Sequence, residues 1–194
     1  MENLGVIDRR VNVNSKKDRK KIFNICIRLA QKSDCEKRKF GSVVLGHTIW
    51  APGKYDPEKH GLAIRGLGYN HKICGLEDFD CCNLRASVPS GTRTEYCAAI
   101  HAEMMALQYA LSNHFLGDNH PEFLFVAGLN GDDSFFDNSK GFYCLPCAKE
   151  LMHAGIQTIA LATAKTPKSG MWSFRAINVA LHESLEFTKG TKKV

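Results

Sequence analysis

Four residues of this chain could together carry out metal chemistry: His101 and Glu103, two positions apart, and Cys144 and Cys147, three apart. Cysteine thiolates and histidine nitrogens are preferred ligands of Zn²⁺. Structural zinc sites usually use four protein ligands, whereas three ligands leave a position for water. The set of His101, Cys144 and Cys147 therefore indicates a catalytic zinc, and Glu103 is placed to move protons in a reaction at that water.

Each motif also has a simpler interpretation. Cys144 and Cys147 could be a redox pair, although the chain lacks a thioredoxin-like βαβ pattern near its start. His101 could be an ordinary histidine at the start of a helix. Short strings such as H-x-E and C-x-x-C also arise by chance, so the elements that carry them are needed to decide.

Both motifs stand at the start of a predicted helix. The segment 101–115, HAEMMALQYALSNHF, is rich in helix formers. The segment 144–155, CLPCAKELMHAG, closes at Gly155, a natural C-cap. Pro146 is tolerated in a first helical turn but not inside a helix, so it supports a helix start here. Cysteines three apart at such a start can bind one metal, and positive helix ends favour their thiolate forms.

The other elements predict an α/β fold, with one sheet and helices on its faces. Ser15 caps a predicted helix over 16–33, and a final amphipathic helix is predicted over 173–186. Short apolar runs predict strands over 40–45, 62–69, 123–129 and 156–162. We expect a single domain over 1–194, with a core over about 16–187 and a basic tail over 188–194.

Composition predicts a protein of a reducing compartment. The fractions of 44% hydrophobic and 24% charged residues are ordinary. No apolar run approaches the roughly 18 to 20 residues of a membrane span, and the first segment lacks the apolar stretch of a signal peptide. We therefore expect a cytoplasmic protein with no membrane partner. In that compartment its eight cysteines are better explained as metal ligands or buried thiols than as disulfides.

The formal charge of +6 suits a phosphate-bearing ligand, from a mononucleotide to a nucleic acid. Much of it lies in clusters at 16–21 and 189–193, where solvated helix faces and a frayed tail are the simpler explanation. We see no basic stripe interleaved with aromatic residues, so a nucleic acid is a less favoured partner than a small nucleotide.

H-A-E followed by C-x-x-C on a second helix resembles the cytidine deaminase superfamily, whose signature is H-x-E…P-C-x-x-C. Three further segments resemble its deoxycytidylate (dCMP) deaminase branch: SDCEKRKFGSVVL at 33–45, GYN at 68–70 and PSGTRTEYC at 89–97. The resemblance implies a three-layer α/β/α sandwich with a central mixed sheet. It also implies hydrolytic removal of the 4-amino group of dCMP, which gives dUMP.

Roles for single residues follow from the same resemblance. The three ligands named above would hold the zinc, Glu103 would be the acid and base, and Asn70 and Ala102 would contact the substrate. Members of this family commonly form homo-oligomers, so we expect more than a monomer.

The chain departs from the family pattern close to the expected substrate site. Tyr143 stands where the family has a proline, Met105 where many relatives have an asparagine, and His71 where a glycine follows GYN. The stretch 130–141 and the chain from 171 onward have no counterpart in the pattern. Another cytosine or adenine substrate therefore stays open, whether a nucleoside, a modified nucleotide or a single strand, as does a non-catalytic zinc module in which Glu103 is idle.

Four other cysteines suggest a second metal: Cys35, Cys81, Cys82 and Cys97. Some dCMP deaminases that this chain resembles carry a second, structural zinc in these segments. Such a zinc would order the irregular stretch 71–97. The alternative is that these are buried thiols that pack as small hydrophobes.

Overall fold

One mixed sheet runs through the centre of the structure, a computed structural model that describes residues 11–48, 62–72, 99–112 and 119–189. The strands of the sheet are β1 (Arg38–Thr48), β2 (Ala63–Tyr69), β5 (Asn119–Asn130), β6 (Phe135–Phe136), β7 (Thr158–Ala162) and β8 (Trp172–Ala176). A separate pair of short strands is formed by β3 (His71–Lys72) and β4 (Ala99–Ile100).

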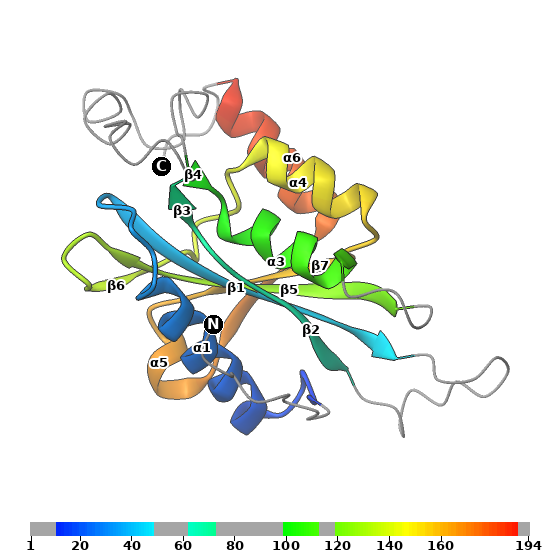
Figure 1. Ribbon diagram of the computed structural model, residues 1–194, viewed down its shortest axis with the longest axis horizontal. Helices are drawn as coiled ribbons and strands as arrows, with labels where there is room; N and C mark the ends of the chain where they lie inside the picture. Colours follow the sequence, from blue (N-terminus) through cyan, green and yellow to red (C-terminus); the bar gives the residue numbers. More distant parts are fainter. Residues whose placement is uncertain (1–10, 49–61, 73–98, 113–118, 190–194) are drawn as a thin grey trace, which may run out of the picture.

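Helices cover both faces of this sheet (Figure 1). One face carries α1 (Lys16–Ala30) and α5 (Thr166–Ser169). The other carries α3 (Ala102–Ser112), α4 (Leu145–His153) and α6 (Ile177–Thr188). The predicted three-layer α/β/α sandwich is thus confirmed. None of the helices in the described ranges is long and apolar enough to cross a bilayer.

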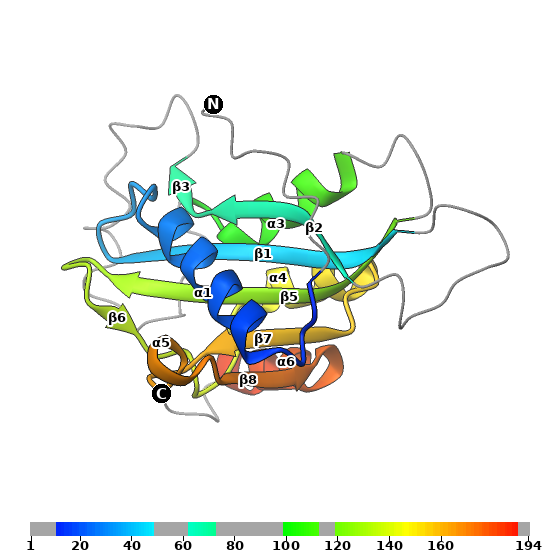
Figure 2. The same ribbon diagram turned by 90° about the horizontal axis from the view of Figure 1, so that it is seen from below.

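The strand order is β2-β1-β5-β7-β8, with β6 paired to β5, as Figure 2 shows from the α1 side. β5 and β7 are parallel and are joined by the crossover through α4, while the other pairs are antiparallel. The starts of α3 and α4 lie side by side, toward the edge of the sheet that the carboxyl ends of the parallel strands β5 and β7 form (Figure 1). Both predicted zinc motifs lie at that edge.

Local sequence explains why the helices begin where they do. The Ser15 side chain accepts a hydrogen bond from the Asp18 N–H and caps α1, as predicted. Cys144 caps α4 in the same way by accepting from the Cys147 N–H, and a proline occupies the first turn. Beyond α4, Gly155 has a φ of +91°, a conformation that favours glycine.

Side chains of the central strands alternate between two cores. Val44 and Val126 point into the core shared with α3 and α4, whereas Val43 and Phe125 point into the core shared with α1. All four are at most 2% exposed. The sheet is therefore buried on both faces, which explains the apolar runs from which it was predicted.

The prediction for the last helix was wrong over its first part. Residues Trp172–Ala176 form β8, which pairs antiparallel with β7, and the helix begins only at Ile177. Trp172 is buried against Phe125 and α1, a contact that a helix over these residues would break. Of the predicted basic tail, residue 188 belongs to α6 and 190–194 lie outside the described residues.

Two glycines of β2 let α3 approach the sheet at backbone distance. A Cβ at Gly68 would overlap the Ala102 carbonyl oxygen and the Ala106 backbone nitrogen, and one at Gly66 would overlap the Ala106 carbonyl oxygen. A shift of flexible side chains cannot relieve these overlaps, since the obstacles are backbone atoms. The glycines therefore fix where α3 begins, and with it the position of His101.

We expect Gly68→Ala to lower the free energy of unfolding by about 2 to 3 kcal/mol, because α3 must move away from β2. Zinc affinity should fall in the same variant, since His101 moves with the helix. Chemical denaturation and zinc competition measure the two effects. Ser112→Ala, at the exposed end of α3, is the control; equal stability of the two variants would contradict this account of the packing.

Candidate metal centre and active site

His101, Cys144 and Cys147 meet at the edge of the sheet. The His101 Nδ1 atom lies 3.2 Å from the Cys144 Sγ and 3.2 Å from the Cys147 Sγ. One ligand atom from each residue lies within 4.8 Å of the other two. His101 is 43 positions from Cys144 and 46 positions from Cys147 in the sequence. The starts of two helices thus bring distant residues together.

The environment of these side chains suits thiolates. Cys144 is the N-cap of α4, its Sγ accepts from the Cys147 N–H at 3.4 Å, and His101 directly precedes α3. Two positive helix ends therefore face the sulfurs, which favours their negative form. One nitrogen and two thiolates at this spacing fit Zn²⁺, with room for the water of a catalytic site.

The Cys144 and Cys147 sulfurs lie in contact with each other beside His101. A disulfide offers no thiolate to a metal, so zinc binding requires the reduced pair. Redox chemistry and zinc binding by Cys144 and Cys147 are therefore exclusive states of one motif, and zinc content under reducing conditions distinguishes them.

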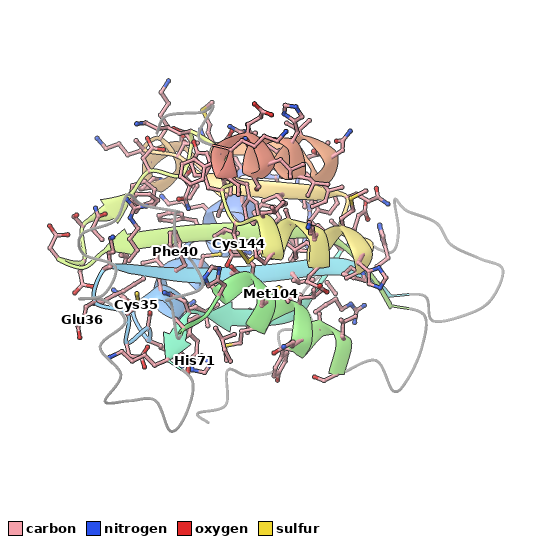
Figure 3. The ribbon with its side chains drawn as sticks, turned by 90° about the horizontal axis from the view of Figure 1, so that it is seen from above. Cys35, Glu36, Phe40, His71, Met104 and Cys144 are labelled. Atoms are coloured by element: carbon pink, nitrogen blue, oxygen red, sulfur yellow. A yellow bond between two sulfur atoms is a disulfide. The ribbon has the colours of Figure 1, made fainter. Side chains whose placement is uncertain are left out.

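Glu103 lies in the first turn of α3, two residues from His101, and is 8% exposed. Both residues line a cavity of about 350 Å³ that also reaches Cys144. Such a volume suits a small ligand the size of a nucleotide. Phe40, Cys144 and Cys35, which are labelled in Figure 3, all line this cavity.

The cavity wall combines aromatic and charged side chains. Its aromatic members are Phe40, Phe136, Phe142, Tyr143 and Phe187, and its cationic members are Lys37, Arg38 and Lys140. The wall also includes Asp137, where burial opposes ionisation but hydrogen bonds from Ser139 outweigh it and lower the pKa. Asp137 is therefore charged at neutral pH, beside the cations.

Comparison with known proteins agrees with this geometry. The family model described as the cytidine and deoxycytidylate deaminase zinc-binding region matches residues 16–163. The chain belongs to this deaminase family. The match includes every zinc ligand and Glu103, but it ends before β8 and α6.

Among solved structures, the deaminase is similar to a mutant cytidine deaminase from Mycobacterium tuberculosis. The two are 12% identical, with a TM-score of 0.42 over 82% of this chain and 90% of that one. No curated protein sequence matches the chain.

Asn70 of the deaminase is 6% exposed and joins β2 to β1. Its Nδ2 donates to the Arg38 carbonyl oxygen at 2.8 Å, and its Oδ1 accepts from the Phe40 N–H at 2.5 Å. The amide carries a second N–H and a second lone pair, so these bonds leave capacity for a ligand. Asn70 and the fully buried Ala102 both line the cavity, and their predicted contact with substrate stays a prediction.

Two residues that depart from the family pattern, Met105 and Tyr143, pack against neighbouring elements. The Met105 sulfur accepts a hydrogen bond from the Tyr69 N–H at 3.4 Å, so it packs α3 on β2. The Tyr143 ring lies 4.7 Å from the Phe187 ring, centroid to centroid. Burial raises the pKa of the Tyr143 hydroxyl, and the Glu183 carboxylate adds to the effect, so this hydroxyl stays neutral.

Of the four cysteines of the predicted second zinc, Cys35 lies in the described residues. Cys35 is half-buried and lines the cavity, while Cys81, Cys82 and Cys97 lie outside the described residues. In the part of the chain that the structure describes, the single cluster of possible metal ligands is the one around His101. The second zinc therefore stays a prediction.

Sequence reasoning left out most of the cavity wall. It placed 130–141 among the departures close to the substrate site without naming a residue there, and Phe136, Asp137 and Lys140 from this stretch line the cavity. The available signal was position, since a polar stretch that ends just before a metal ligand must pass close to the metal. Phe187 gave no such signal.

Proposed function

We propose that this deaminase converts a cytosine nucleotide, most specifically dCMP, to the uracil nucleotide and ammonia by hydrolysis. The observation that supports this best is that a buried Glu103 lines one cavity of nucleotide size together with the ligands His101 and Cys144, whose cluster Cys147 completes. Metal ligands alone would serve a structural zinc. A buried carboxylate beside a three-ligand site is the arrangement needed for proton transfer.

Zinc held by His101, Cys144 and Cys147 would supply a Lewis acid that activates water near neutral pH. Glu103 accepts the proton that the attacking water releases and donates it to N3 of the cytosine ring. As the tetrahedral carbon C4 collapses, Glu103 carries the second proton of the water to the amino group, which leaves as ammonia. Atoms balance, because cytosine and water give uracil and ammonia.

The cavity wall suits a flat base. Phe40 and Phe136 pack edge-to-face with centroids 5.7 Å apart, and the Arg38 guanidinium lies 4.1 Å from the centre of the Phe136 ring. This packing fixes an apolar wall against which a pyrimidine can lie. Asn70, held by the backbone of β1, presents an amide at the same cavity.

Cationic side chains support a phosphorylated substrate. Lys37, Arg38 and Lys140 all line the cavity, against two carboxylates, Glu103 and Asp137. The balance is net positive, which favours a nucleotide over an uncharged nucleoside.

Replacing Lys140 by alanine is expected to raise the KM for dCMP about three- to tenfold and to leave that for deoxycytidine unchanged. The size follows from the roughly 1 kcal/mol that an exposed charge pair contributes. Lys149→Ala on the exposed side of α4 is the matched control. The same change in KM for both substrates would show that Lys140 does not contact the phosphate.

Substrate identity is tested by ammonia release from dCMP, CMP, deoxycytidine, dCTP and a cytosine-bearing single strand, assayed side by side with the zinc-loaded chain. The proposal predicts that dCMP has the highest kcat/KM. Turnover of the single strand without turnover of any mononucleotide would refute it, and inactivity toward every compound would favour a non-catalytic zinc module.

A further inference from the structure

The segment that leads into the metal ligand Cys144 is held by side chains of the last helix. Phe142 stands two residues before Cys144, and both of its backbone polar groups contact α6. Its N–H donates to the Glu183 Oε2 at 3.1 Å, and its carbonyl oxygen lies 2.8 Å from the Ser184 hydroxyl. Glu183 and Ser184 thus hold the two peptide groups that flank the Phe142 Cα atom.

Glu183 is itself fixed by a nearly buried ion pair. The Arg175 Nε donates to both carboxylate oxygens of Glu183, at 3.2 and 3.0 Å, and the two side chains are 16% and 15% exposed. The Arg175 Nη2 donates to the Ser139 carbonyl oxygen at 2.8 Å. Arg175 therefore holds both Glu183 and the segment that Glu183 binds.

The chain is adapted to this arrangement at Gly141. Its φ is +154°, and a Cβ there would lie 3.0 Å from the Glu183 Oε2 atom. A larger residue would press on the carboxylate that accepts from Phe142. From the next turn of α6, Phe187 packs on Tyr143 and lines the cavity.

We propose that Arg175, Glu183 and Ser184 form a clamp, named here the α6 clamp, that positions residues 139–143 and so sets the zinc ligand Cys144 and the adjoining wall of the substrate cavity. These are positioning residues, since they touch Phe142 and Ser139 rather than the reacting atoms. They belong to β8 and α6, which lie beyond the residues 16–163 that the family model matches. The consequence for turnover rests on the proposed function, whereas the consequence for zinc does not.

Zinc affinity, measured by competition with a chromophoric chelator under reducing conditions, tests this proposal. Glu183→Ala is expected to weaken zinc binding about tenfold, the lower end of the effect known for groups that hold metal ligands. Glu183→Gln keeps an oxygen that can accept from the Phe142 N–H, so its zinc affinity should stay within about threefold of the unaltered chain. Glu186→Gln, on the same helix and paired with Lys189 at 3.8 Å, should leave zinc affinity unchanged.

Loss of Glu183 also leaves Arg175 buried without this carboxylate, which could unfold the chain. The double variant R175M/E183M removes both charges and keeps apolar volume, a change that is often neutral for stability. It still releases the Phe142 N–H, so it should show the same tenfold loss of zinc affinity.

An unchanged zinc affinity in the double variant, or equal losses for Glu183→Ala and Glu183→Gln, would overturn the clamp. If these zinc measurements come out as expected but the unaltered chain deaminates no cytosine compound, the clamp stands and the proposed function fails. If the chain deaminates dCMP and the double variant binds zinc normally, the clamp alone fails.

Discussion

Glu103→Gln is expected to lower kcat/KM for dCMP by about 100- to 10,000-fold, the usual range for loss of a general acid and base. Glutamine keeps the size and polarity of the side chain but cannot accept and return a proton. Zinc content should be unchanged, because Glu103 is not among the ligand atoms that meet at His101, Cys144 and Cys147. Steady-state kinetics and metal analysis of the same preparation measure both quantities.

The matched control for this variant is Glu150→Gln, an exposed carboxylate on α4. It makes the same chemical change on the other helix of the site and should leave kcat/KM as it is. Full activity of Glu103→Gln would mean that protons move by another route, and the account of the mechanism would then be wrong. Loss of zinc together with activity would instead make Glu103 part of the metal site.

Cys144→Ser is expected to weaken zinc binding by more than about 100-fold and to abolish turnover. Loss of a metal ligand costs more zinc affinity than loss of a residue that only positions a ligand. This substitution isolates the metal role, because Cys144 is also the N-cap of α4 and serine is one of the best N-caps. The helix start should therefore persist, and circular dichroism of the apo variant should match that of the unaltered apo chain. Zinc competition under reducing conditions measures the affinity.

Cys26→Ala is the control for thiol loss. Cys26 is fully buried in the core under α1, where burial strongly raises the pKa of its thiol, so it is inert. We expect unchanged zinc affinity and a free energy of unfolding lower by about 1 to 2 kcal/mol. Retained zinc in Cys144→Ser, with the chain folded, would remove Cys144 from the ligand set.

Local signals in the sequence were sufficient for the elements that carry the chemistry. Ser15 before an apolar-faced helix, and Cys144 followed by Pro146, mark helix starts that the structure reproduces. The buried strands around Val43 and Phe125 were recognisable because the sheet is covered on both faces. A motif at each of two helix starts was then enough to predict the meeting of His101 with the two cysteines.

Elements fixed by distant contacts were not predictable in the same way. No glycine or proline separates Trp172–Ala176 from α6, so the sequence does not mark where the strand ends. The pairing with β7 makes this segment a strand. The hold of Glu183 on Phe142 spans 41 residues and leaves no local pattern. For the same reason the sequence revealed which residues bind zinc but not which residues position them.

Asn70 was predicted as a functional residue, but its contacts within the fold were not. The resemblance pointed to it as a substrate contact, whereas the structure shows its amide bound to the backbone of β1 on both sides of Lys39. Substrate contact and support of β1 are compatible, because the amide has further donor and acceptor capacity. Its role in substrate binding stays a prediction.

The most direct test of the central claim is a zinc titration of the reduced apo chain with dCMP deamination measured at each step. The account predicts that dUMP and ammonia form in equal amounts, and that activity rises with zinc until His101, Cys144 and Cys147 are saturated. A fully zinc-loaded, folded chain that releases no ammonia from dCMP or any other cytosine compound would contradict it, as would activity that does not depend on zinc.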